Sequence, residues 1–403
     1  MKPFMQVLRS GAESLPCEGT ASRYLGEGRG FSMSARWRLS SQQPGPFRCL
    51  CPSCLTPFRD YDKNWSMLVT SIGSLPFVDV DAAIDAVLAC CPEIPFWPQL
   101  PKRSFWESMY VQCLEGIPGL VIDGEAETVY VDTRKTDGIE RFYEAFSAGN
   151  IDAFPVSERA APGFYRLLER LPEVSGRIRY VKGQLTGPFT LGIGLKDEKD
   201  KPIIYDGAYF DIIKKAIRMK AAWMVKAMKS RCPGTEVLLF FDEPAMVSFG
   251  SAFVPISKEV ATSLFDEVIE GLDATVGIHC CGNTDWSVLL ATGVDLINYD
   301  AFNFMDTLFY FRPELSTFLA RGGRVAPGIV PSSGEALGRV VLTDLARLWH
   351  TFERRLSETG SASKQEAVVT TACGLGSLDE SDARHALELL KHLPEAAQTE
   401  TAG

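Results

Sequence analysis

The sequence ATVGIHCCGN (residues 274–283) places a histidine and two cysteines directly after a short apolar run. Residues 274–278 are small or β-favouring, so they predict a strand that ends at His279. Imidazole and thiolate groups at a strand end are typical of a metal site. A second strand end of this kind lies near the C-terminus, where residues 368–372 lead into Cys373 and a glycine turn. We therefore interpret the rest of the chain as the scaffold that brings these two strand ends together.

The spacing of these residues suits a single metal ion. His279 and Cys281 are two residues apart, so both side chains can reach one ion, whereas Cys280 would point to the opposite face. Cys373 would add a third ligand from another strand. Two thiolates and one imidazole suit zinc, which keeps a fourth position for water or substrate in catalytic sites. The alternative, reduced core cysteines beside a hydrogen-bonded histidine, explains the shared strand-end positions less well.

The overall composition narrows the class of partner. The chain has 403 residues, of which 46% are hydrophobic and 23% charged, enough for one large core or two domains. A formal net charge of −10 argues against nucleic-acid and membrane surfaces, because phosphate binding depends on clustered Lys and Arg. No run reaches the roughly 20 apolar residues of a membrane span, and the N-terminus lacks the apolar core of a signal peptide. With eleven cysteines and no small-domain disulfide framework, we expect a cytoplasmic protein.

The N-terminal region differs from the rest of the chain in its composition and lack of hydrophobic periodicity. Residues 1–66 mix Gly, Ser, Arg and Pro without hydrophobic periodicity, so we predict a weakly ordered extension. Cys49, Cys51 and Cys54 could form half of a zinc knuckle, but no second ligand cluster lies nearby. We expect the functional domain at residues 67–395, followed by a short tail at 396–403.

From residue 67 onward, strand-like apolar runs alternate with helix-like runs. Strands are expected at 67–72, 178–181, 236–241, 274–278, 295–299, 324–327 and 367–371. This alternation predicts parallel strands with helical crossovers. The prolines of residues 90–103 argue against regular structure there, and a separate hairpin is expected at 120–132. We predict an α/β fold consisting of a single (β/α)8 TIM barrel, although the seven expected strands are one fewer than the eight of such a barrel.

Polar residues follow the apolar strands at their C-terminal ends, which in a barrel share one face. These residues are Ser71, Gly73, Ser74, Lys182, Asp242, Glu243, His279, Cys281, Asp300 and Cys373. An open doubly wound sheet would also gather ligands at strand ends, but no G-x-G-x-x-G motif follows the first strand. Asp242, with Glu243 as a second candidate, could bind a substrate ammonium group. The sequence leaves open whether Lys182 faces the site or solvent.

Five short motifs in this order resemble the catalytic module of cobalamin-independent methionine synthase. They are TSIGSLP at 70–76, VKGQLTGP at 181–188, DEPA at 242–245, HCCGN at 279–283 and ACGL at 372–375. The same pattern is similar to that of related zinc methyltransferases of the uroporphyrinogen decarboxylase superfamily. The resemblance covers about residues 67–395. The H-x-C-G-N form is closer to the corrinoid-dependent methyltransferases than to the full-length folate enzyme.

This resemblance implies roles for individual residues. His279, Cys281 and Cys373 would be the zinc ligands. Asp242 would bind the amino group of an amino-acid substrate as the catalytic-site carboxylate, and the turn Ile72-Gly73-Ser74 would bind its carboxylate.

Two further residues match the family's pattern less closely. The resemblance makes Glu125, in the sequence DGE, a candidate second amino-group ligand. Asp300 follows a strand where the related synthases have a glutamate near the metal, which makes it a candidate fourth ligand.

The expected reaction is methyl transfer to a thiol, most simply homocysteine to give methionine. A thiol has a pKa near 8.5 and is mostly protonated at neutral pH, so zinc would supply the thiolate. Only residues 1–66 stand where the folate enzyme has a second barrel. We therefore expect a methylcorrinoid, carried by a partner protein, as donor, and methylfolate as the less favoured one.

Three other functions remain open at this stage. A uroporphyrinogen decarboxylase-like lyase would need arginines that bind several carboxylates, and few arginines lie near the strand ends. A coenzyme M or other thiol methyltransferase would keep the zinc and change the acceptor. A non-catalytic corrinoid- or metal-binding protein is the third.

Overall fold

The structure, a computed structural model, describes residues 67–252, 254–360 and 366–400. Residues 1–66, with Cys49, Cys51 and Cys54, lie outside the described residues, so the predicted N-terminal extension stays a prediction.

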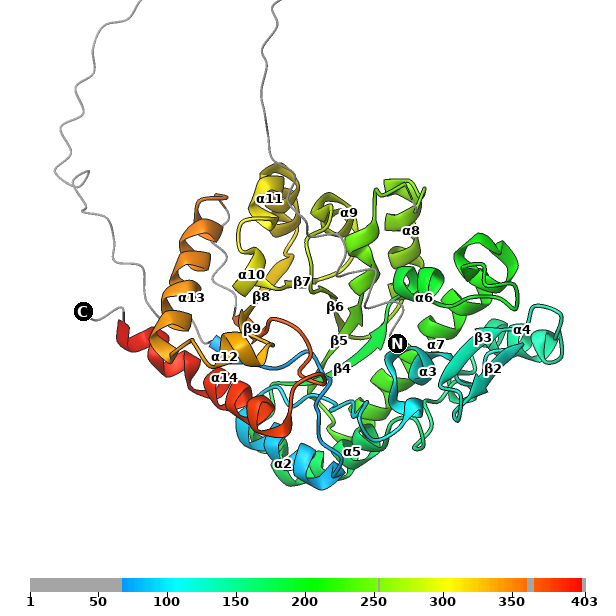
Figure 1. The fold of residues 1–403 in the computed structure, drawn as a ribbon, viewed down its shortest axis with the longest axis horizontal. Coiled ribbons are helices and arrows are strands. Elements are labelled where there is room, and N and C mark those ends of the chain that lie inside the picture. The colour runs from blue at the N-terminus through cyan, green and yellow to red at the C-terminus, as the bar shows by residue number, and fades with distance from the viewer. Residues whose placement is uncertain (1–66, 253, 361–365, 401–403) are drawn as a thin grey trace, which may run out of the picture. The chain divides into compact units, whose positions relative to one another are not determined.

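Seven parallel strands form one curled sheet at the centre of the described chain (Figure 1). They are β1 (Met67–Val69), β4 (Tyr180–Thr186), β5 (Glu236–Asp242), β6 (Thr275–Cys280), β7 (Leu296–Tyr299), β8 (Arg324–Val330) and β9 (Ala367–Thr371). Their order in the sheet is β1-β9-β8-β7-β6-β5-β4, and every neighbouring pair is parallel. The α/β barrel fold that the sequence predicts is therefore confirmed.

The eighth place in the barrel is taken by residues 95–99, between β4 and β1. On one side Lys182 N donates to Pro95 O and Trp97 N donates to Lys182 O, both at 2.9 Å. On the other side Gln99 N donates to Gly73 O at 3.1 Å, and isolated parallel bridges mark both contacts. As the prolines predict, no helix or strand is formed between α2 and residue 104, yet two isolated bridges join this segment to its neighbours. Only the N–H groups of Trp97 and Gln99 are needed, and the prolines occupy other positions.

Helices cover the outside of the sheet (Figure 1). The longer ones are α2 (Val80–Cys90), α4 (Ile139–Ser147), α5 (Pro162–Val174), α7 (Gly207–Arg231), α8 (Lys258–Ile269), α11 (Arg312–Ala320), α13 (Leu342–Ser357) and α14 (Glu380–Glu400). The shorter ones are α3 (Met109–Leu114), α6 (Pro188–Gly194), α9 (Trp286–Ala291), α10 (Ala301–Phe304) and α12 (Gly334–Leu337). Helix α14 includes residues 396–400, which the sequence assigned to the tail. No described helix is long and apolar enough to cross a membrane.

Single helical turns of the 3-10 type join several of these elements. They are η1 (Phe105–Glu107), η2 (Ile151–Ala153), η3 (Ser175–Arg177), η4 (Ile203–Tyr205), η5 (Pro244–Ser248) and η6 (Leu308–Phe311). Several longer helices begin at a residue whose side chain caps the first turn, such as Asp79 before α2, Asp206 before α7 and Ser257 before α8. Each cap accepts a hydrogen bond from an N–H group that has no partner within the helix.

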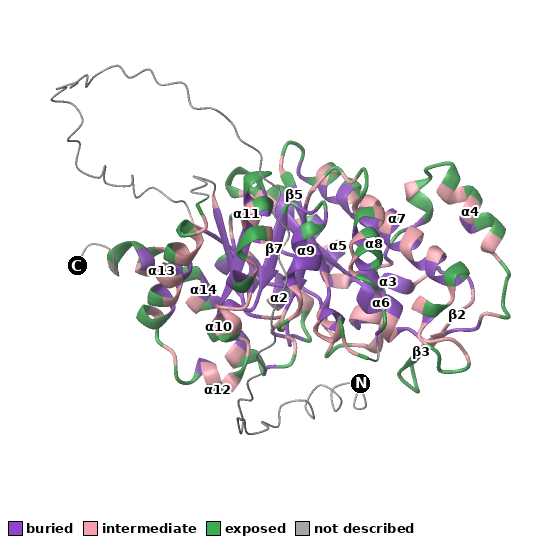
Figure 2. Cartoon of the chain, turned by 90° about the horizontal axis from the view of Figure 1, so that it is seen from above, coloured by how far each residue is buried: buried purple, intermediate pink, exposed green. Residues whose placement is uncertain are grey.

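The strands are buried on both sides (Figure 2). A small apolar cluster fills the barrel interior and consists of Leu68, Ile94, Leu238, Phe240, Leu296, Ala326 and Val368. The larger core lies between the sheet and the surrounding helices. The barrel is thus packed with side chains, and its chemistry is confined to the C-terminal ends of the strands.

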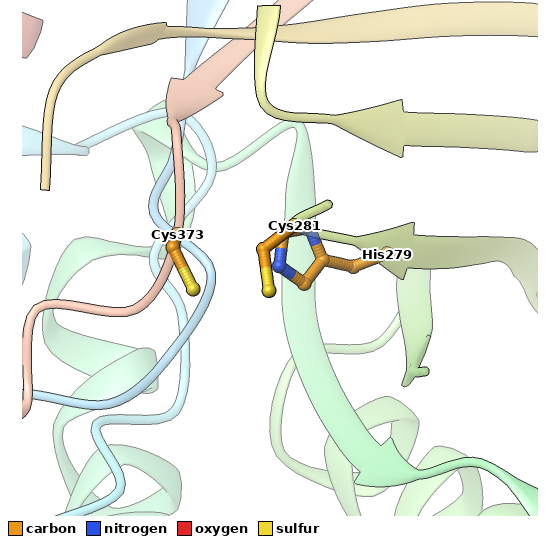
Figure 3. A group of neighbouring side chains, drawn as sticks. All are labelled: His279, Cys281 and Cys373. Carbon is orange, nitrogen blue, oxygen red and sulfur yellow. The ribbon is translucent and has the colours of Figure 1, made fainter. Parts of the chain in front are cut away.

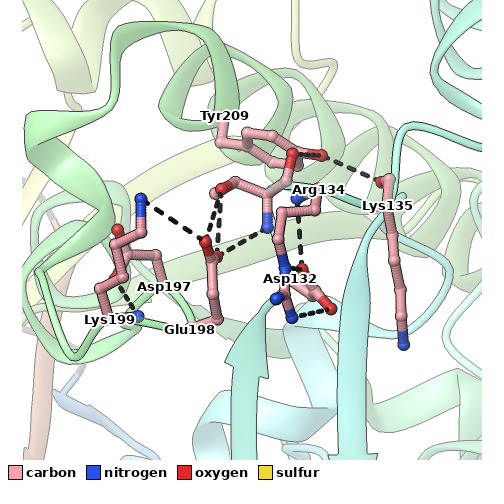
Figure 4. Close-up of polar contacts among 8 residues, drawn as sticks. Asp132, Arg134, Lys135, Asp197, Glu198, Lys199 and Tyr209 are labelled. Carbon is pink, nitrogen blue, oxygen red and sulfur yellow. Dashed lines mark hydrogen bonds and ion pairs between the residues drawn. The ribbon is translucent and has the colours of Figure 1, made fainter.

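A hairpin formed by β2 (Leu120–Asp123) and β3 (Thr128–Val131) makes a separate two-stranded sheet outside the barrel (Figure 1). Polar contacts fasten the segment that follows β3 to the loop before α7 and to α7 itself (Figure 4). Glu198 accepts a hydrogen bond from Thr133 N at 3.0 Å, and the Tyr209 hydroxyl donates to Lys135 O at 3.0 Å. The hairpin is therefore a peripheral element anchored to the barrel's outer layer.

Candidate metal centre

Three side chains with metal-ligating atoms meet at the C-terminal face of the barrel. His279 lies near the end of β6, Cys281 follows that strand, and Cys373 follows the end of β9. Their ligand atoms all lie within 4.8 Å of one another, and Figure 3 shows the three side chains pointing toward one another. Two strands, β7 and β8, separate β6 from β9 in the sheet, so the barrel's curvature brings the ligands together. Cys280 is fully buried and outside this group.

The ring of His279 is held in one tautomer. Its Nδ1 lies 2.5 Å from Asn298 Oδ1. The amide nitrogen of Asn298 donates to Ala326 O at 2.7 Å and to Thr370 Oγ1 at 2.8 Å. The hydroxyl of Thr370 in turn donates to Thr371 O, so it can only accept from Asn298. Because Asn298 must donate on that side, its oxygen accepts from Nδ1–H of His279.

The other ring nitrogen is left available for a metal. Within the described chain, His279 Nε2 is buried and has no hydrogen-bond partner. A metal-ligating histidine commonly donates its second N–H to a supporting acceptor, as His279 does to Asn298. The residues present therefore fit a zinc ion bound through Nε2.

The two thiols of the group have pKa values shifted in opposite directions. A hydrogen bond from Cys373, and the neighbouring His279, hold the pKa of Cys281 well below its usual value. The same hydrogen bond and burial raise the pKa of Cys373. A thiolate beside a thiol is a site where a cation can displace the remaining proton, as metal binding to cysteines requires.

We expect Asn298→Ala to weaken zinc binding without removing a ligand. The imidazole would lose its orienting acceptor, and such losses cost roughly 10- to 100-fold in metal affinity. Competition with a chromophoric chelator measures the change. Asn150→Ala, at an exposed asparagine before η2, is the control and should leave affinity unchanged. Equal affinities for Asn298→Ala and wild type would contradict this role.

Asp300 is near this group but outside it. Its side chain caps α10, accepting from Asn303 N at 2.8 Å and from Asn303 Nδ2 at 2.7 Å. Both carboxylate oxygens are thus engaged with Asn303, and the structure does not bring Asp300 into the ligand cluster as a fourth ligand. Its short side chain folds back onto its own helix.

Asp242 is the last residue of β5 and pairs in register with His279 of β6. Its Oδ1 is buried and has no hydrogen-bond partner among the described residues. Burial raises the pKa of Asp242 to about 6, opposed by His279 and Lys182. A sequestered carboxylate oxygen beside the candidate metal ligands is a suitable acceptor for a substrate ammonium group.

Glu243 points elsewhere, contrary to the expectation that it binds substrate. It accepts hydrogen bonds from Phe189 N at 3.0 Å, Thr190 N at 2.7 Å and Thr190 Oγ1 at 2.6 Å. These groups belong to the first turn of α6, so Glu243 satisfies that helix terminus. It is fully buried, and burial raises its pKa to about 8. Adjacent carboxylates thus have different surroundings.

The turn Ile72-Gly73-Ser74 lies between β1 and the loop of Cys373. Ser74 O accepts from Leu375 N at 2.8 Å, and Ser74 Oγ accepts from Gly376 N at 3.3 Å. The N–H groups of Gly73 and Ser74 have no hydrogen-bond partner in the described part of the chain. Two free donors on a turn tied to a ligand loop are suited to binding a carboxylate.

Glu125 is not part of this site. It is exposed in the turn between β2 and β3, where its N–H donates to Asp123 Oδ1 at 3.0 Å. The hairpin lies outside the barrel (Figure 1), so the structure does not place Glu125 with the metal ligands.

Two supporting residues, Asn298 and Thr370, were missed in the sequence. Each is a polar, fully buried residue in a largely apolar strand: Asn298 lies in β7, and Thr370 lies in β9 beside Thr371. A polar residue in the middle of a buried strand must find a hydrogen-bond partner. That signal could have marked both as residues of the site.

Comparisons with known proteins do not identify a function for the chain. No protein-family model and no curated protein matches the chain. Matching solved structures include a β-mannanase from the blue mussel Mytilus edulis, at 9% identity and TM-score 0.29, covering 81% of this chain and 92% of that one. Another is the GH99 endo-α-mannosidase from Bacteriodes thetaiotaomicron in complex with BIS-TRIS-Propane, at 9% identity and TM-score 0.25, covering 60% and 86%.

Proposed function

We propose that this protein is a zinc-dependent methyltransferase that methylates a thiol, with homocysteine as acceptor and methionine as product. The observation that carries the proposal is the convergence of His279, Cys281 and Cys373, with Nε2 of His279 buried and unpartnered. These residues would hold the ion, which supplies the thiolate form of an incoming thiol at neutral pH.

The residues around the ligands support an amino-acid thiol as the acceptor. Asp242 presents a sequestered carboxylate oxygen for the ammonium group. The N–H groups of Gly73 and Ser74 are free to bind the carboxylate group, and their turn is tied to the Cys373 loop. The ammonium and carboxylate groups on the α-carbon of homocysteine would thus both be bound, while the sulfur at the other end of the molecule faces the proposed ligands. Coenzyme M, whose sulfonate end has no ammonium group, would leave Asp242 without a partner.

A methylcorrinoid, carried by a partner protein, is the proposed methyl donor. A methyl group on cobalt transfers to a thiolate more readily than one on a folate nitrogen. The H-x-C-G-N sequence at the ligands also resembles the corrinoid-dependent enzymes. We place the reaction in the cytoplasm, where thiols and the ligand cysteines stay reduced.

The direct test combines metal analysis with a methyl-transfer assay. Purified protein is analysed for zinc by mass spectrometry and incubated with methylcobalamin and homocysteine, coenzyme M or cysteine. We expect one zinc per chain and faster product formation with homocysteine than with the other thiols. Protein without zinc, or zinc protein inert toward every thiol, would refute the proposal. Methylation from methylfolate alone would refute only the donor.

A further inference from the structure

Lys182 occupies an unusual position inside the barrel. It lies on β4, is fully buried, and its Nζ is 4.6 Å from the centre of the Phe240 ring. Phe240 belongs to the cluster that fills the barrel interior. A buried ammonium group is costly unless it forms hydrogen bonds or pairs with a charge. The partners of Lys182 therefore indicate what it does.

The first partner is the backbone of the turn proposed to bind the substrate carboxylate. Lys182 Nζ donates to Ile72 O at 2.5 Å and to Gln184 Oε1 at 3.1 Å. Gln184, two residues along the same strand, donates from its Nε2 to Trp97 O at 2.8 Å. These two side chains support the turn from the interior of the barrel.

The contact between Lys182 and Ile72 fixes the direction of a neighbouring N–H group. The described chain has no cis peptide bonds, so the C=O of Ile72 and the N–H of Gly73 point in opposite directions from one peptide plane. Because Ile72 O points inward to Lys182, the Gly73 N–H points away from the barrel interior, where it has no partner within the described chain.

The same arrangement explains why residue 73 is glycine. Its φ is +150°, and a Cβ atom there would lie 2.2 Å from Gln184 Nε2. The turn is thus pressed against the side chains of β4. Any movement of Lys182 or Gln184 would be passed directly to the peptide that carries the Gly73 N–H.

We propose that Lys182 is a positioning residue that orients the Ile72–Gly73 peptide and thereby sets the affinity of the site for a substrate carboxylate. This inference rests on the proposed function, because it assigns a selectivity to the same site. Lys182 acts through the turn and makes no contact with the reacting sulfur.

The test compares two acceptors that differ only in the carboxylate. Homocysteine carries it, and 3-aminopropane-1-thiol keeps the thiol and the amine but lacks it. In Lys182→Met, the KM for homocysteine should rise on the order of 10- to 100-fold, the range for loss of a residue that positions a binding group. The KM for 3-aminopropane-1-thiol, kcat and zinc content should change by less than about threefold. Lys182→Gln, which keeps a donor, should recover part of the lost affinity.

A second buried lysine provides the matched control. Lys220 of α7 is also almost fully buried and donates to Pro155 O at 2.7 Å. Lys220→Met removes a buried ammonium group without touching the turn, so it should leave the preference for homocysteine intact. Thermal unfolding of each variant shows whether it is folded.

The outcomes separate this inference from the proposed function. The positioning role is wrong if Lys182→Met and Lys182→Gln keep the wild-type preference for homocysteine, or if the KM values for both thiols rise equally. Either result would leave the proposed methyltransferase function intact. If the wild-type protein methylates neither thiol, the proposed function is wrong, and the proposed preference for a carboxylate-bearing thiol is wrong as well.

Discussion

Replacing Cys373 by serine should abolish zinc binding and thiol methylation together. Cys373, which follows β9, is the proposed third ligand, and without it only His279 and Cys281 at the end of β6 would remain to bind the ion. A serine hydroxyl keeps its proton at neutral pH and is a poor substitute for a thiolate. The loss of activity should exceed the roughly 10- to 100-fold that removal of a supporting residue costs.

Cys280→Ala is the matched control for this variant. Cys280 is adjacent to Cys281, fully buried, and its Sγ lies 3.6 Å from Gly282 O, outside the ligand group. Zinc content by mass spectrometry and the rate of methionine formation should match those of the wild type. Full zinc occupancy in Cys373→Ser would show that the zinc is bound without Cys373 and that the proposed ligand set is wrong.

Asp242→Asn should weaken homocysteine binding while the protein keeps its zinc. The neutral amide cannot pair with the substrate ammonium group. Loss of one partner of a buried charge pair costs roughly 2–5 kcal/mol, which at 1.4 kcal/mol per factor of ten is about 30- to 4000-fold in affinity. The KM for homocysteine measures this change. The KM for 4-sulfanylbutanoate, which lacks the amine, should stay close to its wild-type value.

Glu243→Gln provides the contrast. Glu243 is the carboxylate next to Asp242, and it binds the first turn of α6, whereas Asp242 is proposed to bind substrate. An amide presents only one accepting atom where the carboxylate presents two. We expect a lower melting temperature with an unchanged ratio of the two KM values. If Glu243→Gln altered the preference for the amine and Asp242→Asn did not, the two roles would have to be exchanged.

The sequence predicted the barrel because its strands and helices alternate along the chain. It missed how the barrel closes, since residues 95–99 contain two prolines and lack a regular strand pattern. Whether an extended proline-containing segment joins a sheet depends on which N–H groups the neighbouring strands require. Those neighbours, β1 and β4, lie elsewhere in the sequence.

The sequence by itself determined which residues of this protein could ligate a metal. Histidine and cysteine side chains two residues apart at a strand end point to one side, and this local rule needs no knowledge of the fold. The proposed grouping of His279 and Cys281 with Cys373 follows from that rule and from the barrel's common face for strand ends.

Only the tertiary structure decided which polar groups at that face are already engaged. Asp300 and Glu243 carry the right chemical groups, yet their oxygens are bound to Asn303 and to the first turn of α6. Asp242 keeps one buried oxygen without a protein partner. Hydrogen-bond partners come from segments distant along the chain, so the sequence could propose these carboxylates but could not tell them apart.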